Sequence, residues 1–169
     1  AIGGIVIAEP SKTFLKDSLY GKTLIYGGSN GEGGSIVSKL TRTYESGWFS
    51  TLQGTLKRFG DFNAADYIMS NTGFIDKSAS FQIGLNRFNY GFEFFLSSIN
   101  NEIGILQASH LHTAGDQIRA INSDSILYVD DFTYKINAPK QKVTHNLIKS
   151  KVYKRFQGFG KVTLQYHFQ

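Results

Sequence analysis

The strongest constraint on the fold is a two-residue alternation of apolar and polar side chains in FQIGLNRFNYGFEFFLSS, residues 81–98. Successive side chains of a β-strand point to opposite faces, so this pattern predicts two strands of a hairpin with one apolar face. We expect Asn86 to lie opposite Asn89, because this register sorts nearly every apolar residue to one side, Phe95 excepted. The segment KVTLQYHFQ repeats the alternation. The apolar face so predicted carries Phe81, Ile83, Leu85, Tyr90, Phe92, Phe94, Leu96, Val162, Leu164, Tyr166 and Phe168.

The opposite face of the hairpin is unusual for a surface exposed to water. A solvent-facing sheet commonly carries Lys, Glu, Arg and Thr, whereas this face is small and mostly uncharged. We therefore expect the polar face to pack against something inside the molecule and the apolar face to contact lipid, as in a membrane β-barrel. The residues of the polar face are Ser78, Ser80, Gln82, Gly84, Gly91 and Ser97.

About seven strands are predicted after Gly21, and the connections between them alternate in length. Those near residues 45–47, 86–89 and 157–160 are short, those near 60–73 and 100–143 are long, and the one near 30–34 is modest. Short turns at one rim and long loops at the other are typical of outer-membrane barrels. Aromatic residues gather near the short turns, as in an interfacial girdle: Tyr44, Trp48, Phe88, Tyr90, Phe156 and Phe159.

Composition excludes several other classes of protein. The chain of 169 residues has no cysteine, so disulfide scaffolds and thiolate metal sites are excluded. A net charge of +5 is spread along the chain with no nucleic-acid reader motif. No apolar run approaches the ~20 residues of a membrane helix, but a barrel strand needs only ~9–11. The turn GGSNGEGG matches a phosphate-binding loop only in its glycine content, and we predict neither an enzyme nor a cofactor.

The long segment near 100–143 predicts one or two helical turns near residues 114–122. Thr113 and Asp116 have the spacing of a helix cap. His110 and His112 would point the same way on a strand, yet two histidines without a third ligand do not predict a metal site. Asp130 and Asp131 are adjacent and would face opposite ways on a strand, so they do not form a glycosidase pair.

Three phrases resemble TonB-dependent outer-membrane receptors of the Bacteroidota type. AIGGIVIAEP resembles the closing strand of the plug domain of these receptors. NNEIGILQASH and DFTYKINAPKQKVTHNLIKSKVY resemble an early extracellular loop and the strand that leaves it. The resemblance implies an all-β fold, with residues 1–20 as the end of the plug and its linker. Residues 21–169 would be the first third of an antiparallel transmembrane barrel, with a short helix in a long extracellular loop.

The resemblance also implies a function, a location and a set of partners. Such receptors lie in the outer membrane of Gram-negative bacteria, bind a scarce solute such as a ferric siderophore, and import it into the periplasm. The implied partners are the lipid bilayer, lipopolysaccharide, the remaining plug and barrel, and TonB, which would bind through a segment absent from this sequence. The candidate solute contacts, all in the extracellular loop, are His110, His112, Asp116 and Arg119.

Three alternatives remain open from the sequence. Counting AIGGIVIAEP as a strand gives about eight strands, enough for a small complete outer-membrane barrel. A soluble β-rich binding module, built as a sandwich or a barrel, would use the apolar face as its core. A structural subunit of a larger envelope assembly would use the barrel as a scaffold.

Overall fold

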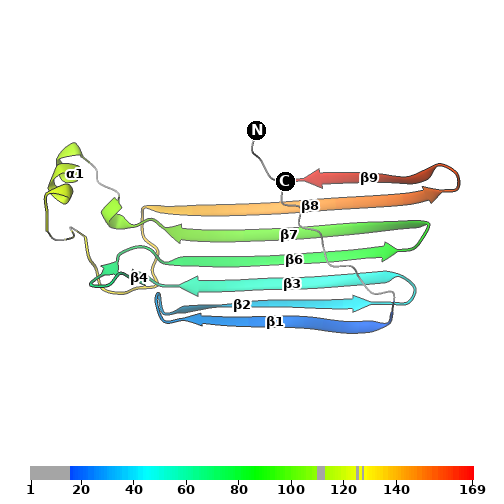
Figure 1. Cartoon of the computed structure of the whole chain (residues 1–169), viewed down its shortest axis with the longest axis horizontal. Helices are drawn as coiled ribbons and strands as arrows, with labels where there is room; N and C mark the ends of the chain where they lie inside the picture. Colours follow the sequence, from blue (N-terminus) through cyan, green and yellow to red (C-terminus); the bar gives the residue numbers. More distant parts are fainter. Residues whose placement is uncertain (1–15, 110–112, 125, 127) are drawn as a thin grey trace.

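Seven strands form a single antiparallel sheet in which every strand pairs with its neighbours along the chain, as Figure 1 shows. The structure is a computed structural model that describes residues 16–109, 113–124, 126 and 128–169. The strands, in their order across the sheet, are β1 (Ser18–Gly28), β2 (Gly33–Thr43), β3 (Trp48–Phe59), β6 (Phe74–Asn86), β7 (Tyr90–Gly104), β8 (Lys140–Phe156) and β9 (Gly160–Phe168). The prediction of an antiparallel all-β fold with about seven strands is therefore confirmed.

The connections at the two ends of the sheet differ in length, as the sequence predicted. The turns after β2, β6 and β8 lie at one end, on the right of Figure 1, and are short. The opposite end carries the short turn between β1 and β2, residues 29–32, and two long loops. These loops contain the two-stranded ribbon of β4 (Phe62–Asn63) and β5 (Ile68–Met69), the short helix η1 (Gln107–Ser109) and α1 (Ala114–Ile121). We call these the short-turn end and the long-loop end.

The predicted helix is confirmed at Ala114–Ile121, and so is its cap. Thr113 has an extended backbone, and its hydroxyl accepts a hydrogen bond from the Asp116 N–H at 3.1 Å. A side chain at this position satisfies one of the N–H groups that the first helical turn leaves without a partner.

The register of the central hairpin differs from the prediction by two residues. Asn86 lies opposite Gly91, not Asn89, and Ile83 lies opposite Phe94. A two-residue turn would have required Arg87 and Phe88 to adopt positive φ, which costs free energy for such residues. The longer turn avoids this, since no residue of 87–89 has a positive φ. A shift of two leaves every side chain on the predicted face.

Two boundaries also differ from the prediction. Strand β7 continues to Gly104 and β8 begins at Lys140, so the long loop spans residues 105–139 rather than 100–143. Strand β1 begins at Ser18, within the segment that we expected to be a linker. The polar residues of 100–102 and 140–142 hide the ends of β7 and β8 from an apolar pattern. The predicted plug strand, residues 1–10, lies outside the described residues.

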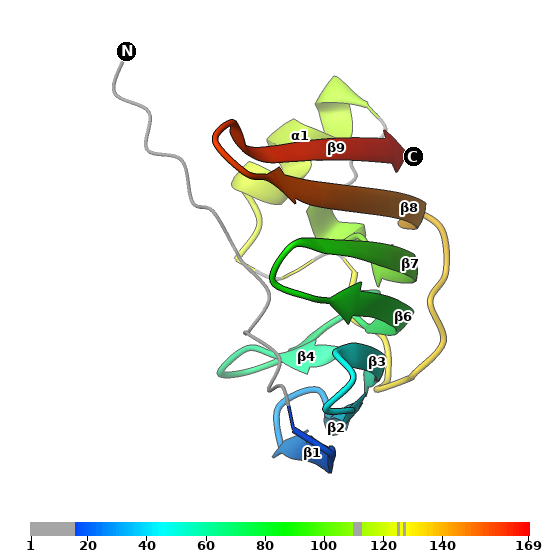
Figure 2. The same cartoon turned by 90° about the vertical axis from the view of Figure 1, so that its right-hand side faces the viewer.

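The described part of the chain forms one layer, and the sheet does not close on itself. Figure 2 shows β1 and β9 at opposite edges of this layer. Only two apolar residues of the described ranges are buried, Phe49 and Phe59. Neither α1 nor η1 is long and apolar enough to span a membrane.

Candidate membrane surface and aromatic pocket

The pairing registers place apolar residues of six strands, β2, β3, β6, β7, β8 and β9, on one face of the sheet. Leu40 lies opposite Leu52, Leu52 opposite Phe81, and Phe81 opposite Leu96. The same row continues through Ile148 to Phe168. All eleven residues predicted from the two alternating segments lie on this side, which we call the apolar face. Thr51, Gln82 and Ser97 lie on the other side, the polar face.

The apolar face is uncovered by any other part of the described chain. Leu52 is 58% exposed, and Leu164 is 73% exposed. Burying apolar side chains supplies most of the free energy of folding, so a face of this size requires a cover. The outward apolar residues of β3 run from Trp48 to Leu56, which at ~3.3 Å per residue corresponds to about 26 Å of strand. A lipid-facing band is ~25 Å tall, and a strand of this length, tilted by about 35–45°, would span roughly 19–22 Å of that height.

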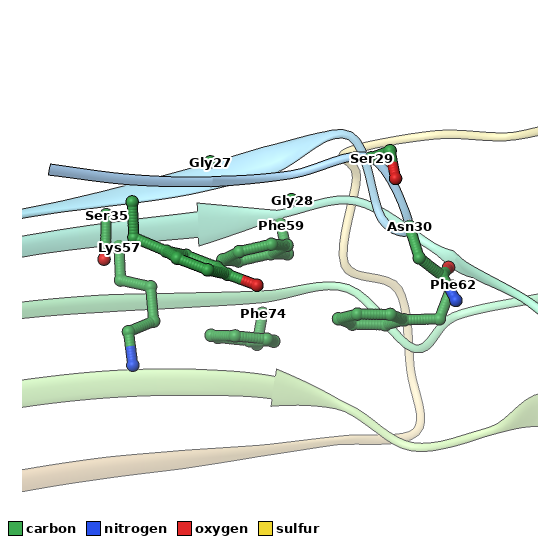
Figure 3. Close-up of a pocket in the computed structure, with 10 residues that line it drawn as sticks. Gly27, Gly28, Ser29, Asn30, Ser35, Lys57, Phe59, Phe62 and Phe74 are labelled. Carbon is green, nitrogen blue, oxygen red and sulfur yellow. The ribbon is translucent and has the colours of Figure 1, made fainter.

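The polar face carries a pocket at the long-loop end (Figure 3), formed by β1, β2, β3, β6 and the ribbon strand β4. The Phe59 ring stacks on those of Phe74 and Phe62, at centroid distances of 5.2 and 5.8 Å. The Lys57 ammonium lies 6.0 Å from the centre of the Phe74 ring. The open pocket measures about 710 Å³ and is lined by Tyr26, Gly27, Gly28, Ser29, Asn30, Ser35, Lys57, Phe59, Phe62 and Phe74.

Gly31, in the turn between β1 and β2, and Gly33, the first residue of β2, make room for these rings. A Cβ on Gly33 would lie 2.5 Å from the Phe59 ring, and one on Gly31 would lie 3.1 Å from the Phe62 ring. The sequence predicted only a turn here, because the glycine pattern does not reveal which side chains approach it. The pocket offers flat apolar surfaces, amide and hydroxyl groups and one cation, a combination that suits a planar, negatively charged ligand.

Three buried polar residues tie the long loops together next to the pocket. Asp61 is 1% exposed, and its carboxylate accepts hydrogen bonds from the N–H groups of Thr72 and Thr133 at 2.9 and 3.3 Å. The Ser70 hydroxyl accepts one from the Asp130 N–H at 2.7 Å. The Asn71 amide donates to the carbonyl oxygens of Ile105 and Pro139, at 2.9 and 2.8 Å. We call Asp61, Ser70 and Asn71 the loop clasp.

Sequence reasoning missed both the pocket and the loop clasp. The partners of the clasp residues lie up to 72 positions away along the chain, and a single sequence shows no periodic signal for such pairs. The pocket likewise depends on the folding of residues 60–73 over the polar face. The aromatic residues of 59–74 were visible in the sequence, but not their convergence.

Two of the four predicted solute contacts lie within the described residues, and two lie outside them. His110 and His112 lie outside the described residues. Asp116 and Arg119 lie on α1, where they form an exposed ion pair of 3.4 Å. Asp116 also accepts a hydrogen bond from the Thr113 hydroxyl at 2.8 Å, so its carboxylate serves the helix cap. Within the described ranges, no three His, Cys, Asp or Glu residues converge as a metal site would require.

The fold defines an antiparallel sheet with one uncovered apolar face and one polar face that carries a pocket. Comparisons with protein-family models, with curated proteins and with solved structures found no match to this chain.

Proposed function

We propose that this chain is part of the wall of an outer-membrane β-barrel receptor of the TonB-dependent type. The receptor would bind a scarce solute, such as a ferric siderophore, and import it into the periplasm. One observation carries the membrane part of the proposal: an uncovered apolar face runs across the whole sheet, while the buried apolar residues Phe49 and Phe59 lie on the other face. A soluble protein would instead bury its apolar face and expose its polar face to water.

The structure of the long-loop end favours a role in binding a solute over a role as a passive part of the barrel wall. In outer-membrane barrels, long loops face the outside of the cell and short turns face the periplasm. The aromatic pocket lies at this end and on the face that would line the barrel, where an entering solute would meet it. The loop clasp holds the surrounding loops in one arrangement, and a preorganised site binds at a lower cost in entropy.

Import would require parts beyond this sheet. In the proposal, further strands of the same receptor pair with β1 and β9, the edge strands of the sheet within the described residues, and a plug packs against the polar face. Phe95, which lies on that face opposite Lys149 and Gln82, would then contact the plug. An intact polypeptide several-fold heavier than 18.8 kDa in the source cell would agree with this reading. A mass of 18.8 kDa would favour the small complete barrel.

Fluorescence quenching by lipid tests which face meets the membrane. Trp48 is the single tryptophan of the sequence and lies on the apolar face, 42% exposed. Reconstitution into lipids with brominated acyl chains should quench Trp48, compared with the same lipids without bromine. In a Trp48→Phe background, Phe94→Trp should likewise be quenched and Phe95→Trp should not, because these neighbours lie on opposite faces.

The same experiment distinguishes the membrane proposal from the alternative of a soluble binding module. A soluble binding module would stay monodisperse without detergent, and brominated lipid would quench none of the three tryptophans. That result would exclude lipid contact and leave the apolar face as the core of a larger soluble assembly. Equal quenching at positions 94 and 95 would also contradict the proposal.

A further inference from the structure

Each of the three turns at the short-turn end carries an aromatic ring with a cation stacked against it. We define the short-turn rim as residues 42–48, 85–90 and 154–162. In the first turn, the Arg42 guanidinium lies 4.8 Å from the centre of the Tyr44 ring. Arg155 lies 4.8 Å from the Phe88 ring of the second turn, and Lys154 lies 5.2 Å from the Phe156 ring near the third.

The cations of this rim have no carboxylate partners within the described residues. The rim contains five cations, Arg42, Arg87, Lys154, Arg155 and Lys161, and one carboxylate, Glu45. All three ion pairs of the described part of the chain lie elsewhere, on α1 and at the long-loop end. Lys140 and Lys142 at that end share Glu102, so much of the charge there is already balanced.

The rings of the rim are exposed in a manner that suits the boundary between lipid and water. Phe88 is 78% exposed and Phe159 is 79% exposed. Aromatic rings prefer the level of the lipid headgroups, and long basic side chains extend from apolar surroundings toward that level. A cation stacked on such a ring is held at the height of the lipid phosphates.

We propose that the short-turn rim binds the phosphates of anionic phospholipids and thereby gathers these lipids in the leaflet at that end. This inference rests on the proposed membrane location and goes beyond it, because lipid contact alone requires no preference among headgroups. The excess of positive charge selects lipids with a net negative charge. The phosphate of a zwitterionic headgroup is balanced by its own amine, so it gains less from these cations.

The test compares the association of spin-labelled phosphatidylglycerol and phosphatidylcholine with the reconstituted protein. Phosphatidylglycerol should associate more strongly, and the preference should decline as salt is added. The triple variant Arg42→Gln, Lys154→Gln, Arg155→Gln should lose the preference. The ratio of the association constants of the two lipids should fall by up to about fivefold for each cation removed. The variant Arg42→Lys, Arg155→Lys keeps the charge and should keep the preference.

A charge-matched control removes three cations from the polar face: Lys39→Gln, Lys149→Gln, Lys151→Gln. This control should retain the preference for phosphatidylglycerol, since these side chains lie on the polar face and outside the short-turn rim, whereas Arg155 reaches the Phe88 ring of the turn. Equal association of the two lipids with the unaltered protein would overturn the inference while leaving the membrane location intact. A protein that immobilises neither lipid would contradict the membrane location as well.

Discussion

Gly33 is the residue on which the packing of the aromatic pocket most directly depends. Strand β2 passes β3 at this point so closely that any side chain would meet the Arg58 carbonyl oxygen and the Phe59 ring. Phe59 is also one of the two buried apolar residues of the described ranges. A glycine here permits the close approach that lets the three phenylalanine rings stack.

Substitution of Gly33 by alanine should therefore displace the Phe59 ring and destabilise the protein. We expect a loss of about 1–3 kcal/mol in the free energy of unfolding, the usual cost of forcing an extra methyl group into a packed site. Chemical denaturation followed by Trp48 fluorescence measures this change. Gly27→Ala, on the neighbouring strand β1, is the matched control, because the nearest atom to its Cβ would be 4.0 Å away, an ordinary contact. Equal stability of the two variants would contradict the packing argument.

At the scale of elements, the faces of the strands were predictable and their register was not. Alternation in the hairpin assigns each residue to a face, and a register shift of two residues preserves that assignment. The length of the turn decides the register, and that length depends on the backbone angles available to Arg87 and Phe88. Polar strand ends, such as residues 100–104, lack an alternation of apolar and polar side chains, so the sequence predicted a loop there.

One of these polar strand ends carries a pH-sensitive contact between β7 and β8. The Glu102 carboxylate lies 2.8 Å from the Lys140 ammonium and 3.2 Å from that of Lys142. Hydrogen bonding by Lys140, with a smaller contribution from Lys142, holds the pKa of Glu102 below its ordinary value of 4.5. The residue lies beyond the apolar residues that β7 contributes to the apolar face, of which Leu96 is the last.

Acidification should loosen the long-loop end of the β7–β8 pair. A lowered pKa in the folded state means that the ion pair stabilises fully above the ordinary pKa of glutamate. This contribution disappears as the pH falls through the lowered value. We expect the hydrogen-exchange protection factors of amides near residues 101–104 and 140–143, which correct for the intrinsic pH dependence of exchange, to decrease over that range. Glu102→Gln should lack this pH dependence, whereas identical profiles for the two proteins would exclude the ion pair as its source.

At the scale of the whole molecule, the loop clasp joins loops that are distant in sequence. Asp61 contacts both the loop that follows β3 and the segment that precedes β8. A buried carboxylate that accepts hydrogen bonds from several backbone N–H groups is costly to replace. Each N–H group left without an acceptor loses a hydrogen bond, and water cannot easily reach the site to replace it.

Asp61→Asn should free the segment near Thr133 from the rest of the long-loop end. Asparagine has one acceptor oxygen where aspartate has two, and its amide would face an N–H donor. We expect a loss of about 1–3 kcal/mol in local stability, measured as faster hydrogen exchange of the Thr72 and Thr133 amides. Asp66→Asn is the control in the same loop, because Asp66 is exposed. Unchanged exchange in Asp61→Asn would show that the clasp does not hold these loops.

The sequence by itself determined the strands, the two faces of the sheet, the alternation of loop lengths and the capped helix. Each of these follows from local periodicity or from residues a few positions apart. Tertiary structure alone decided the aromatic pocket, the loop clasp and the stacking of Arg155 on Phe88 at the short-turn rim. These depend on side chains such as Arg155 and Phe88 meeting across strands, and no local pattern in the sequence encodes such meetings.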